Sequence, residues 1–306
     1  MLKTFEEIRE YALSFGRKRV AIPMAEDETS LRTAIFALER GFAESVLIGN
    51  GEKIKEILSR INQSPQDFEI IEAHTPEEAS FKAVSLAREG KVDIILKGYM
   101  HTHVLLKAIL DSKNGLRTGR LLSDVLIAEN PALDYKGIVG MSDGGINILP
   151  NLEQKKQIIE NAVKVFHFLG YTKPKVALLA AVEVVNEAMP ATVEAAELTK
   201  MNREGEIKEC VVHGPLALDL AVSKEAAKKK KIESEVAGEA DILIVPNIEA
   251  GNILGKAFTY YAHAKVGHVI IGAKIPILIP SRNESENDKL NSIALSIIVT
   301  HHKNAV

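Results

Sequence analysis

The sequence of 306 residues lacks the features that mark secreted and membrane-spanning proteins. Cys210 is its only cysteine, so no disulfide can form within the chain and a thiolate metal cluster is excluded, as suits a reducing cytosol. No apolar run approaches the roughly 20 residues of a membrane helix. The first 15 residues mix acidic with apolar side chains, unlike a signal peptide. The net charge of -3 gives no general attraction to nucleic acid or to an anionic membrane. We therefore expect a cytoplasmic protein.

Several catalytic and cofactor motifs are missing as well. Without GxxxxGK[ST] or GxSxG, neither a P-loop kinase nor a nucleophile-elbow hydrolase is indicated. Cys210 falls inside an apparent strand, which indicates an inert core thiol. His101 and His103 would lie on different faces of a helix, and no matching carboxylates accompany them. We therefore predict no metal site.

A dinucleotide fingerprint is present only in part. Gly49-Asn50-Gly51 follows an apparent strand and precedes a helix, and Glu69 and Glu72 lie about 20 residues further on. Ile54 stands where the third glycine should be, so we interpret the segment as a common turn.

The apolar residues occur in two kinds of segment that alternate along the chain. Apolar residues make up 46% of the sequence and charged residues 26%, enough for a sizeable core. Continuous apolar runs are typical of strands that are covered on both faces, and amphipathic helices separate them. This order predicts doubly wound, mostly parallel sheets. The predicted strands are 19–25, 44–50, 68–73, 92–98, 175–183, 206–214, 240–247 and 268–280.

A glycine-rich segment divides the pattern. Residues 134–150 end in proline and indicate a crossing between two lobes, after which helices and strands resume. The sequence thus predicts an α/β fold of two α/β/α domains with a ligand cleft between them. Ligands of open α/β sheets bind beyond the carboxyl ends of the strands, so the residues that follow strands are the candidates.

Two basic groups fit an anion. Lys97, Gly98 and Thr102 open a predicted helix, whose N-terminus favours negative charge; simple capping is the alternative. Arg117 and Arg120 stand beside two glycines, and a guanidinium fork suits phosphate; exposed loop arginines are the alternative.

Two further groups follow later strands. Asn252 and Lys256 are four residues apart at a helix start, so they point together at a ligand or at water. Ser281, Arg282 and Asp288 lie where a strand stops and the last helix begins. They could bind an oxyanion and move a proton, or they could be a helix cap and its neighbours.

Six segments carry a family resemblance along nearly the whole chain. They are KGYMHTHVLL, LRTGRLLSDV, SDGGINILPNLEQKKQI, GPLALDLAVS, ADILIVPNIEAGNILGKAF and IIGAKIPILIPSR, the last followed by Asp288. Together they resemble the phosphate acetyl/butyryltransferase family. The LRTGRLLS stretch and the short length favour its butyryl branch.

The resemblance implies an activity and an organisation. Members convert an acyl-CoA and phosphate reversibly into an acyl phosphate and CoA, and they need no cofactor besides these substrates. The expected acyl group is butyryl or branched, and the expected assembly is a homodimer. The implied domains are 1–137 plus 269–306, and 138–268.

The resemblance also assigns residues and leaves alternatives. The family's catalytic serine, arginine and aspartate fall on Ser281, Arg282 and Asp288. His213 replaces a frequent aspartate, and Tyr260 replaces an arginine of the acetyl branch. Phosphate acetyltransferase activity and a non-catalytic protein that binds acyl phosphate or CoA remain alternatives. A metal-dependent oxidoreductase would need a carboxylate cluster that the strand ends lack.

Overall fold

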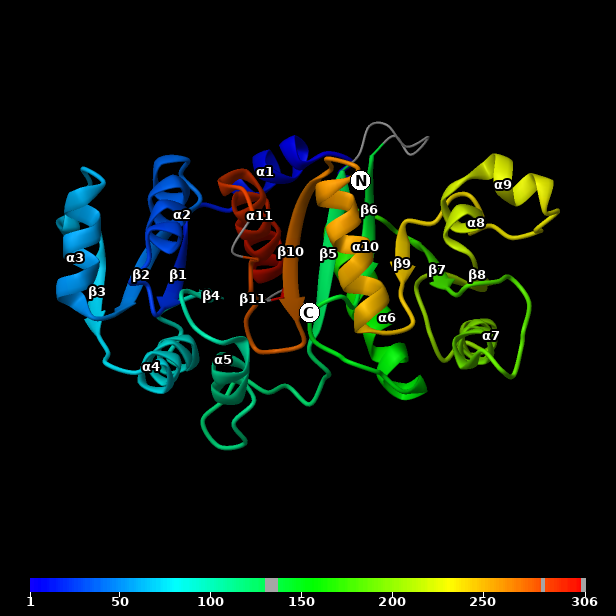
Figure 1. Ribbon diagram of the computed structural model, residues 1–306, viewed down its shortest axis with the longest axis horizontal. Coiled ribbons are helices and arrows are strands. Elements are labelled where there is room, and N and C mark those ends of the chain that lie inside the picture. Colours follow the sequence, from blue (N-terminus) through cyan, green and yellow to red (C-terminus); the bar gives the residue numbers. More distant parts are fainter. Residues whose placement is uncertain (130–136, 282–283, 304–306) are drawn as a thin grey trace. The chain divides into compact units, whose positions relative to one another are not determined.

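The described residues of the computed structural model, 1–129, 137–281 and 284–303, fall into two compact units (Figure 1). Unit A comprises Ile8–Arg120 and Gly267–Val306, and unit B comprises Met1–Glu7 and Leu121–Val266. The domain bounds expected from the resemblance stay a prediction.

Unit A is built on a mostly parallel sheet. Its strand order is β3-β2-β1-β4-β11-β10, and only β10 and β11 pair antiparallel. Because β2 and β3 extend the sheet on one side of β1 and β4 lies on the other, the strand order reverses between β1 and β4. Such a switch point is where open α/β sheets bind ligands. The strands are β1 (Lys18–Pro23), β2 (Ala43–Gly49), β3 (Glu69–Glu72), β4 (Ile94–Leu96), β10 (Lys265–Ile271) and β11 (Ile277–Leu278).

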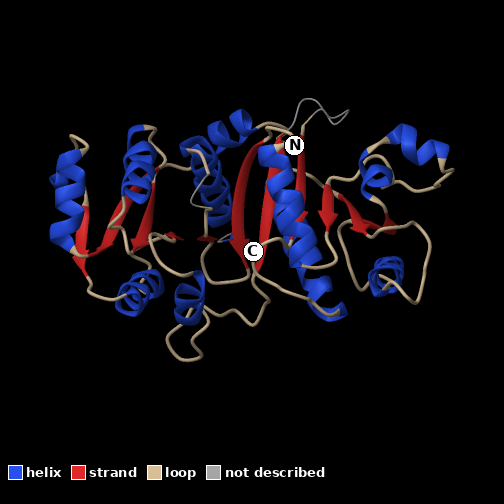
Figure 2. Ribbon diagram, in the orientation of Figure 1, coloured by secondary structure: helices blue, strands red, loops and turns tan. Residues whose placement is uncertain are grey.

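Helices lie along both faces of this sheet (Figure 2). Polar side chains cap the N-termini of three of these helices. Asp27, Asn50 and Thr75 each accept a hydrogen bond from a first-turn N–H group. The helices α2, α3 and α11 pack as one group, and α4 packs with α5. The bounds are α1 (Phe5–Leu13), α2 (Glu28–Glu39), α3 (Gly51–Arg60), the 3-10 turn η1 (Pro65–Asp67), α4 (Pro76–Arg88), α5 (Thr102–Ile109) and α11 (Glu286–Lys303).

The last helix, α11, is buried around its whole circumference over residues 289–300. It contacts α2 on one side and β4 and β11 on another. A helix enclosed in this way needs apolar residues on every side, as Leu290, Ile293 and Ile297 provide. A charged side chain at a buried position of this helix, such as that of Lys289, is therefore an exception to its apolar pattern.

Unit B has the strand order β5-β6-β9-β7-β8, in which only β5 and β6 pair antiparallel. The helices α6 and α7 cover one face of this sheet, and α8, α9 and α10 lie on the other. The strands are β5 (Ser123–Glu129), β6 (Ile138–Ser142), β7 (Lys175–Leu179), β8 (Val211–Leu216) and β9 (Ile242–Ile244). The helices are α6 (Leu152–Phe168), α7 (Pro190–Arg203), α8 (Leu218–Val222), α9 (Lys224–Lys229) and α10 (Ile248–Tyr260).

The predicted α/β fold with mostly parallel sheets is confirmed, but two local predictions are wrong and two strands were missed. The expected strand 268–280 is two antiparallel strands, because the chain reverses at Gly272 with φ 106° and is interrupted by Pro276. Residues 216–231, whose pattern predicts a single helix, form two helices, because the extended backbone of Ser223 ends α8 and its hydroxyl caps α9. Strands β5 and β6 were not predicted.

Candidate functional site

A pocket of about 220 Å³ opens in unit A at the switch point of the sheet. Three segments that follow parallel strands meet there: one after β1, one after β4 and one after β11. The lining includes three predicted site residues, Lys97, Gly98 and Ser281. They are far apart in sequence, and the parallel neighbours β4 and β11 bring them to the same edge of the sheet.

Gly98 allows the ends of β1 and β4 to approach closely. A Cβ at this position would lie 2.6 Å from the carbonyl oxygen of Pro23, too close for any side chain. The Gly98 N–H donates to that same oxygen over 3.1 Å. The glycine is therefore required for backbone packing, and its N–H group is already engaged.

The side chain of Lys97 is held at the floor of the pocket. Its Nζ donates to the carbonyl oxygens of Gly98 at 3.3 Å and Met100 at 3.1 Å. These two acceptors fix the direction of the ammonium and place a positive charge beside the pocket.

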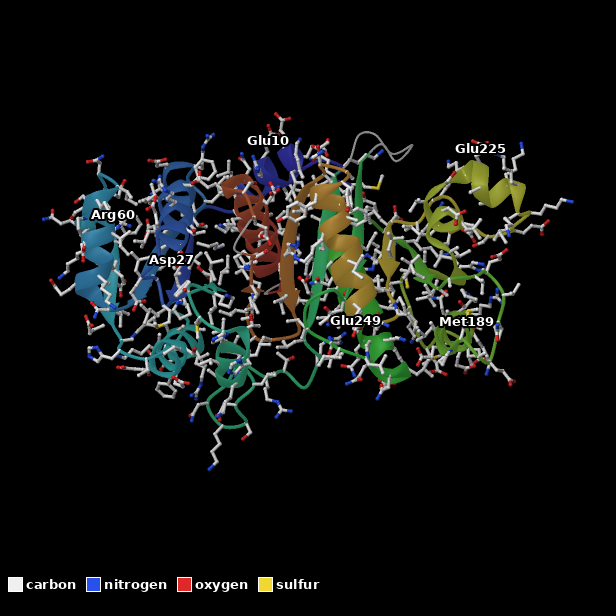
Figure 3. The ribbon with its side chains drawn as sticks, viewed as in Figure 1. Glu10, Asp27, Arg60, Met189, Glu225 and Glu249 are labelled. Atoms are coloured by element: carbon white, nitrogen blue, oxygen red, sulfur yellow. The ribbon has the colours of Figure 1, made fainter. Side chains whose placement is uncertain are left out.

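The start of α2 forms another wall of the pocket. Asp27, which Figure 3 labels, caps this helix by accepting the Ser30 N–H at 3.0 Å and the Ser30 hydroxyl. Glu28, in the first turn, pairs with Arg32 and Arg60. The carboxylates of this wall are thus engaged with their own helix or with arginines.

Ser281 is positioned by a glutamate three residues later. The Ser281 N–H donates to Glu284 Oε1 at 2.6 Å, and the Glu284 N–H donates to the Ser281 carbonyl at 3.2 Å. The Glu284 side chain is only 9% exposed. In the described part of the chain, no hydrogen bond of the Ser281 hydroxyl occurs, so this group is available at the pocket wall.

Asp288 belongs to the first turn of α11. Its N–H donates to the Ser285 hydroxyl at 3.1 Å, and that hydroxyl donates to Asp288 Oδ2 at 2.6 Å. The Ser285 hydroxyl thus caps one N–H group of the first turn, and the Asp288 carboxylate holds that hydroxyl in place. Asp288 is not among the residues that line the pocket. The contacts of Asp288 are therefore those of a helix cap, and its predicted role in proton transfer stays a prediction.

Sequence reasoning missed Lys289, the neighbour of Asp288. Its side chain lines the pocket although the residue is only 5% exposed. Burial lowers the pKa of its ammonium, while the nearby carboxylates of Glu284 and Asp27 act in the opposite direction. No local pattern marked it, because a lysine in the first turn of a predicted helix is usually exposed to solvent.

Three further predicted residues of unit A, Thr102, Arg117 and Arg120, are not among those that line the pocket. Thr102 is the first residue of α5. Arg117 and Arg120 are exposed residues of the segment between α5 and β5, where Arg117 forms a bridge with Ala273. Arg282 lies outside the described residues. The substrate contacts predicted for all four stay predictions.

Asn252 and Lys256 lie in unit B, exposed on successive turns of α10. The start of this helix packs on a glycine-rich loop, since a Cβ at Gly251 would lie 2.7 Å from the Cα of Gly144. The Asn252 Nδ2 donates to the Gly144 carbonyl at 3.5 Å. Whether these two residues contact the same ligand as Ser281 stays a prediction.

The same loop contains a perturbed carboxyl that sequence reasoning also missed. Asp143 is 3% exposed, and burial, with the neighbouring Asp124, raises its pKa to about 6. The N–H groups of Gly145 and Ile146 and the Asn147 side chain donate to it and oppose this shift.

We expect the Asp143 carboxyl to titrate near pH 6 in the folded protein, well above its reference value of 3.8. Because the folded state then binds the proton more tightly, the stabilisation is complete below pH 3.8 and is lost as the pH rises through about 6. A carboxyl-carbon NMR titration measures this directly. Asp111 is the control, since the N–H groups of Asn114 and Lys113 lower its pKa. A midpoint near pH 4 for Asp143 would contradict the expected effect of burial.

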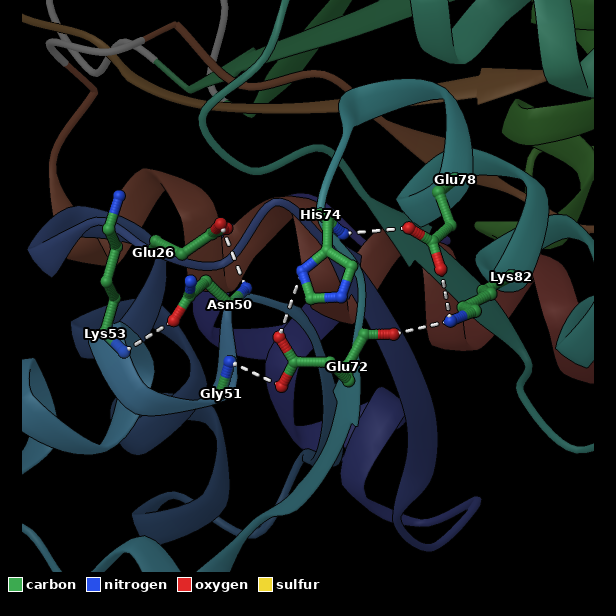
Figure 4. A network of polar contacts seen from close by, with 8 residues as sticks. All are labelled: Glu26, Asn50, Gly51, Lys53, Glu72, His74, Glu78 and Lys82. Carbon is green, nitrogen blue, oxygen red and sulfur yellow. Dashed lines mark hydrogen bonds and ion pairs between the residues drawn. The ribbon is translucent and has the colours of Figure 1, made fainter.

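In the segment with the partial dinucleotide fingerprint, two glutamate carboxylates bind the backbone N–H groups (Figure 4). Glu26 Oε1 accepts the Asn50 N–H at 3.0 Å, and Glu72 Oε2 accepts the Gly51 N–H at 3.0 Å. A Cβ at Gly49 would lie 2.6 Å from the Glu26 carboxyl carbon. These glycines therefore make room for acidic side chains, which would repel a pyrophosphate at the start of α3.

The family described as phosphate acetyl/butaryl transferase matches residues 75–297. The chain is also 41% identical over 303 residues to a phosphate butyryltransferase of Clostridium acetobutylicum. The aligned residues make up 99% of this chain and 100% of the relative. The chain belongs to this family. A phosphate acetyltransferase of Thermotoga maritima is 44% identical over 293 residues, 96% of this chain and 98% of the relative. A solved branched-chain phosphotransacylase from Enterococcus faecalis has a TM-score of 0.81 and 33% identity, covering 93% and 99% of the two chains.

The two departures from the phosphate acetyl/butyryltransferase pattern lie in unit B. His213 is part of β8, where burial lowers the pKa of its imidazole. Tyr260 is the last residue of α10 and is 56% exposed. Cys210 is buried as predicted, but it lies directly before β8 and not inside a strand. Burial raises the pKa of its thiol to about 12.

Among the residues that the structure describes, no helix is long and apolar enough to cross a membrane. Within residues 1–129, 137–281 and 284–303, no group of three or more His, Cys, Asp or Glu side chains is arranged to hold a metal ion.

Proposed function

We propose that this protein is a phosphate butyryltransferase, which transfers a short-chain acyl group reversibly between CoA and inorganic phosphate. Family membership over nearly the whole chain supports this proposal. The observation that carries it is the pocket at the sheet's switch point, which both Ser281 and Lys97 line.

The reaction needs no covalent enzyme intermediate when both substrates bind together. A phosphate oxygen attacks the thioester carbonyl, the C–O bond forms, and the C–S bond breaks as the thiolate leaves and takes a proton. Phosphate is a weak and well-hydrated nucleophile, so it must be held close to the thioester and away from water.

Each proposed role matches a charge or a proton that moves in this reaction. Ser281 donates a hydrogen bond to the carbonyl oxygen or to the sulfur. Arg282 binds the phosphate and stabilises the negative charge that grows in the transition state. In the opposite direction, Asp288 takes the proton of the CoA thiol, whose pKa of about 8.5 makes it a poor nucleophile at neutral pH.

The other predicted residues bind substrate in this proposal. Lys97, beside the pocket, contributes positive charge, and Gly98 shapes its wall. Contacts with CoA or phosphate are proposed for Thr102, Arg117, Arg120, Asn252 and Lys256. A homodimer located in the cytoplasm is also proposed, on the family resemblance alone.

We expect the purified protein to release free thiol from butyryl-CoA only when phosphate is present, with no added metal or nicotinamide. The assay follows thiol appearance with and without phosphate, before and after dialysis against EDTA. Turnover that disappeared with EDTA and returned with a divalent ion would contradict the proposed mechanism. Binding of butyryl-CoA without thiol release would instead identify a non-catalytic binding protein.

The acyl group is decided by a second measurement. Identity does not separate the alternatives, since a phosphate acetyltransferase is 44% and a phosphate butyryltransferase 41% identical to the chain. Rates with acetyl-, propionyl-, butyryl- and branched acyl-CoA compare them directly. A higher kcat/KM with acetyl-CoA than with butyryl-CoA would favour phosphate acetyltransferase.

A further inference from the structure

Two buried lysines of this protein have opposite surroundings. Lys155 and Lys289 are each 5% exposed. The Lys155 ammonium forms an ion pair with Glu194. The side chain of Lys289 makes no hydrogen bond or ion pair within the part of the chain that the structure describes, yet it lines the pocket beside Ser281. Such an ammonium is costly, because it loses its hydration and gains only the attraction of nearby carboxylates, without a hydrogen bond.

The pocket around Lys289 favours an anion. Asp27 also lines it, but its carboxylate is used by the Ser30 N–H and hydroxyl at the helix cap. Glu28 is paired with two arginines. The first N–H groups of a helix have no acceptor within that helix, and the start of the 12-residue α2 is part of the pocket wall. The Ser30 N–H is taken by Asp27, which leaves the N–H groups of Glu28 and Thr29 at this wall, and Lys289 lines the same pocket from α11.

We propose that Lys289 is a substrate-binding residue whose ammonium binds a phosphate group in this pocket, together with the N-terminus of α2. This inference rests on the proposed function, in which both substrates carry phosphate: inorganic phosphate itself and CoA. The unpaired charge is then a binding device that the ligand neutralises. A lysine that only filled space could be replaced by methionine without any effect on substrate.

The test compares Lys289→Met with the wild-type protein by calorimetric titration with inorganic phosphate. Methionine keeps the length and the apolar stem of lysine and removes the charge. Loss of a charge-assisted hydrogen bond is expected to weaken phosphate binding roughly 10- to 100-fold. The melting temperature should stay equal or rise, because an unpaired buried charge disappears. Lys289→Gln provides a second uncharged variant if the methionine variant does not fold.

Lys155→Met is the matched control. It removes an equally buried ammonium, but one that already has a protein partner, and it leaves Glu194 without its ion pair. We expect it to lower the melting temperature and to leave phosphate affinity unchanged. Equal weakening by both variants would mean that general destabilisation is responsible, and it would overturn the inference.

Separate titrations distinguish the two sources of phosphate. Weaker binding of inorganic phosphate to Lys289→Met assigns the residue to the attacking substrate. Weaker binding of CoA alone, with inorganic phosphate unaffected, assigns it to a phosphate group of CoA. Unchanged affinity for both ligands overturns the inference. Since binding is measured without turnover, absence of thiol release from the wild-type protein would contradict the proposed function while leaving this result intact.

Discussion

Arg282→Ala is expected to lower kcat/KM for phosphate-dependent thiol release by about 10²–10³-fold, which corresponds to roughly 2.7–4 kcal/mol of lost transition-state stabilisation. The reason is the proposed contact between its guanidinium and the phosphate, where negative charge increases during attack. The preceding residue, Ser281, lines the pocket and follows β11. The melting temperature should remain close to that of the wild-type protein, because the proposed role of this guanidinium is to bind substrate and not to hold the fold.

Two variants show whether the effect depends on the guanidinium. Arg282→Lys should restore only part of the activity, since an ammonium cannot form the two parallel hydrogen bonds of a guanidinium. Arg88→Ala removes an exposed arginine of α4 that donates to Asn114, and it should leave kcat/KM unchanged. Full activity in Arg282→Lys would mean that charge alone is sufficient. Normal activity in Arg282→Ala would remove this residue from the mechanism.

The part of the site that could be predicted is the part governed by local pattern. Continuous apolar runs identified β4, and the apolar run before Ser281 contains β11, so Lys97 and Ser281 were recognised as strand-end residues. Parallel strands carry such residues to the same edge, although which strands are neighbours is decided by the packing of the whole unit. The sequence therefore predicted the candidates, while their meeting in one pocket came from the strand order.

The parts that were missed depend on contacts that no local pattern contains. The segments 123–129 and 138–142 form β5 and β6, but the second lies in the glycine-rich region that was interpreted as a crossing. Gly98 was interpreted as part of an anion-binding helix start, whereas the close approach of Pro23 requires it. Lys289 resembles a surface lysine in sequence and is buried only because α2 packs against α11.

Asp288→Asn is expected to slow acyl-CoA formation from acyl phosphate and CoA by about 10²–10⁴-fold, the usual contribution of a general base. Asparagine keeps the shape of the side chain, and its carbonyl oxygen can still accept the Ser285 hydroxyl, so the first turn of α11 should remain capped. The melting temperature should consequently change little. The measurement is the rate of thiol consumption at saturating CoA, together with a thermal melt.

Ser285→Ala is the matched variant, because it removes the cap and keeps the carboxylate. The Ser285 hydroxyl accepts the Asp288 N–H and donates to Asp288 Oδ2, and both bonds disappear with alanine. The loss of such a cap typically lowers the free energy of unfolding by about 1 kcal/mol. Catalysis should survive at moderate temperature, since the proposed base is still present. The two residues are hydrogen-bonded to each other, so their two variants separate proton transfer from capping. Asp288→Asn should lose activity and keep stability, whereas Ser285→Ala should lose stability and keep activity. Near-normal acyl-CoA formation in Asp288→Asn would leave Asp288 with the role of a helix cap alone.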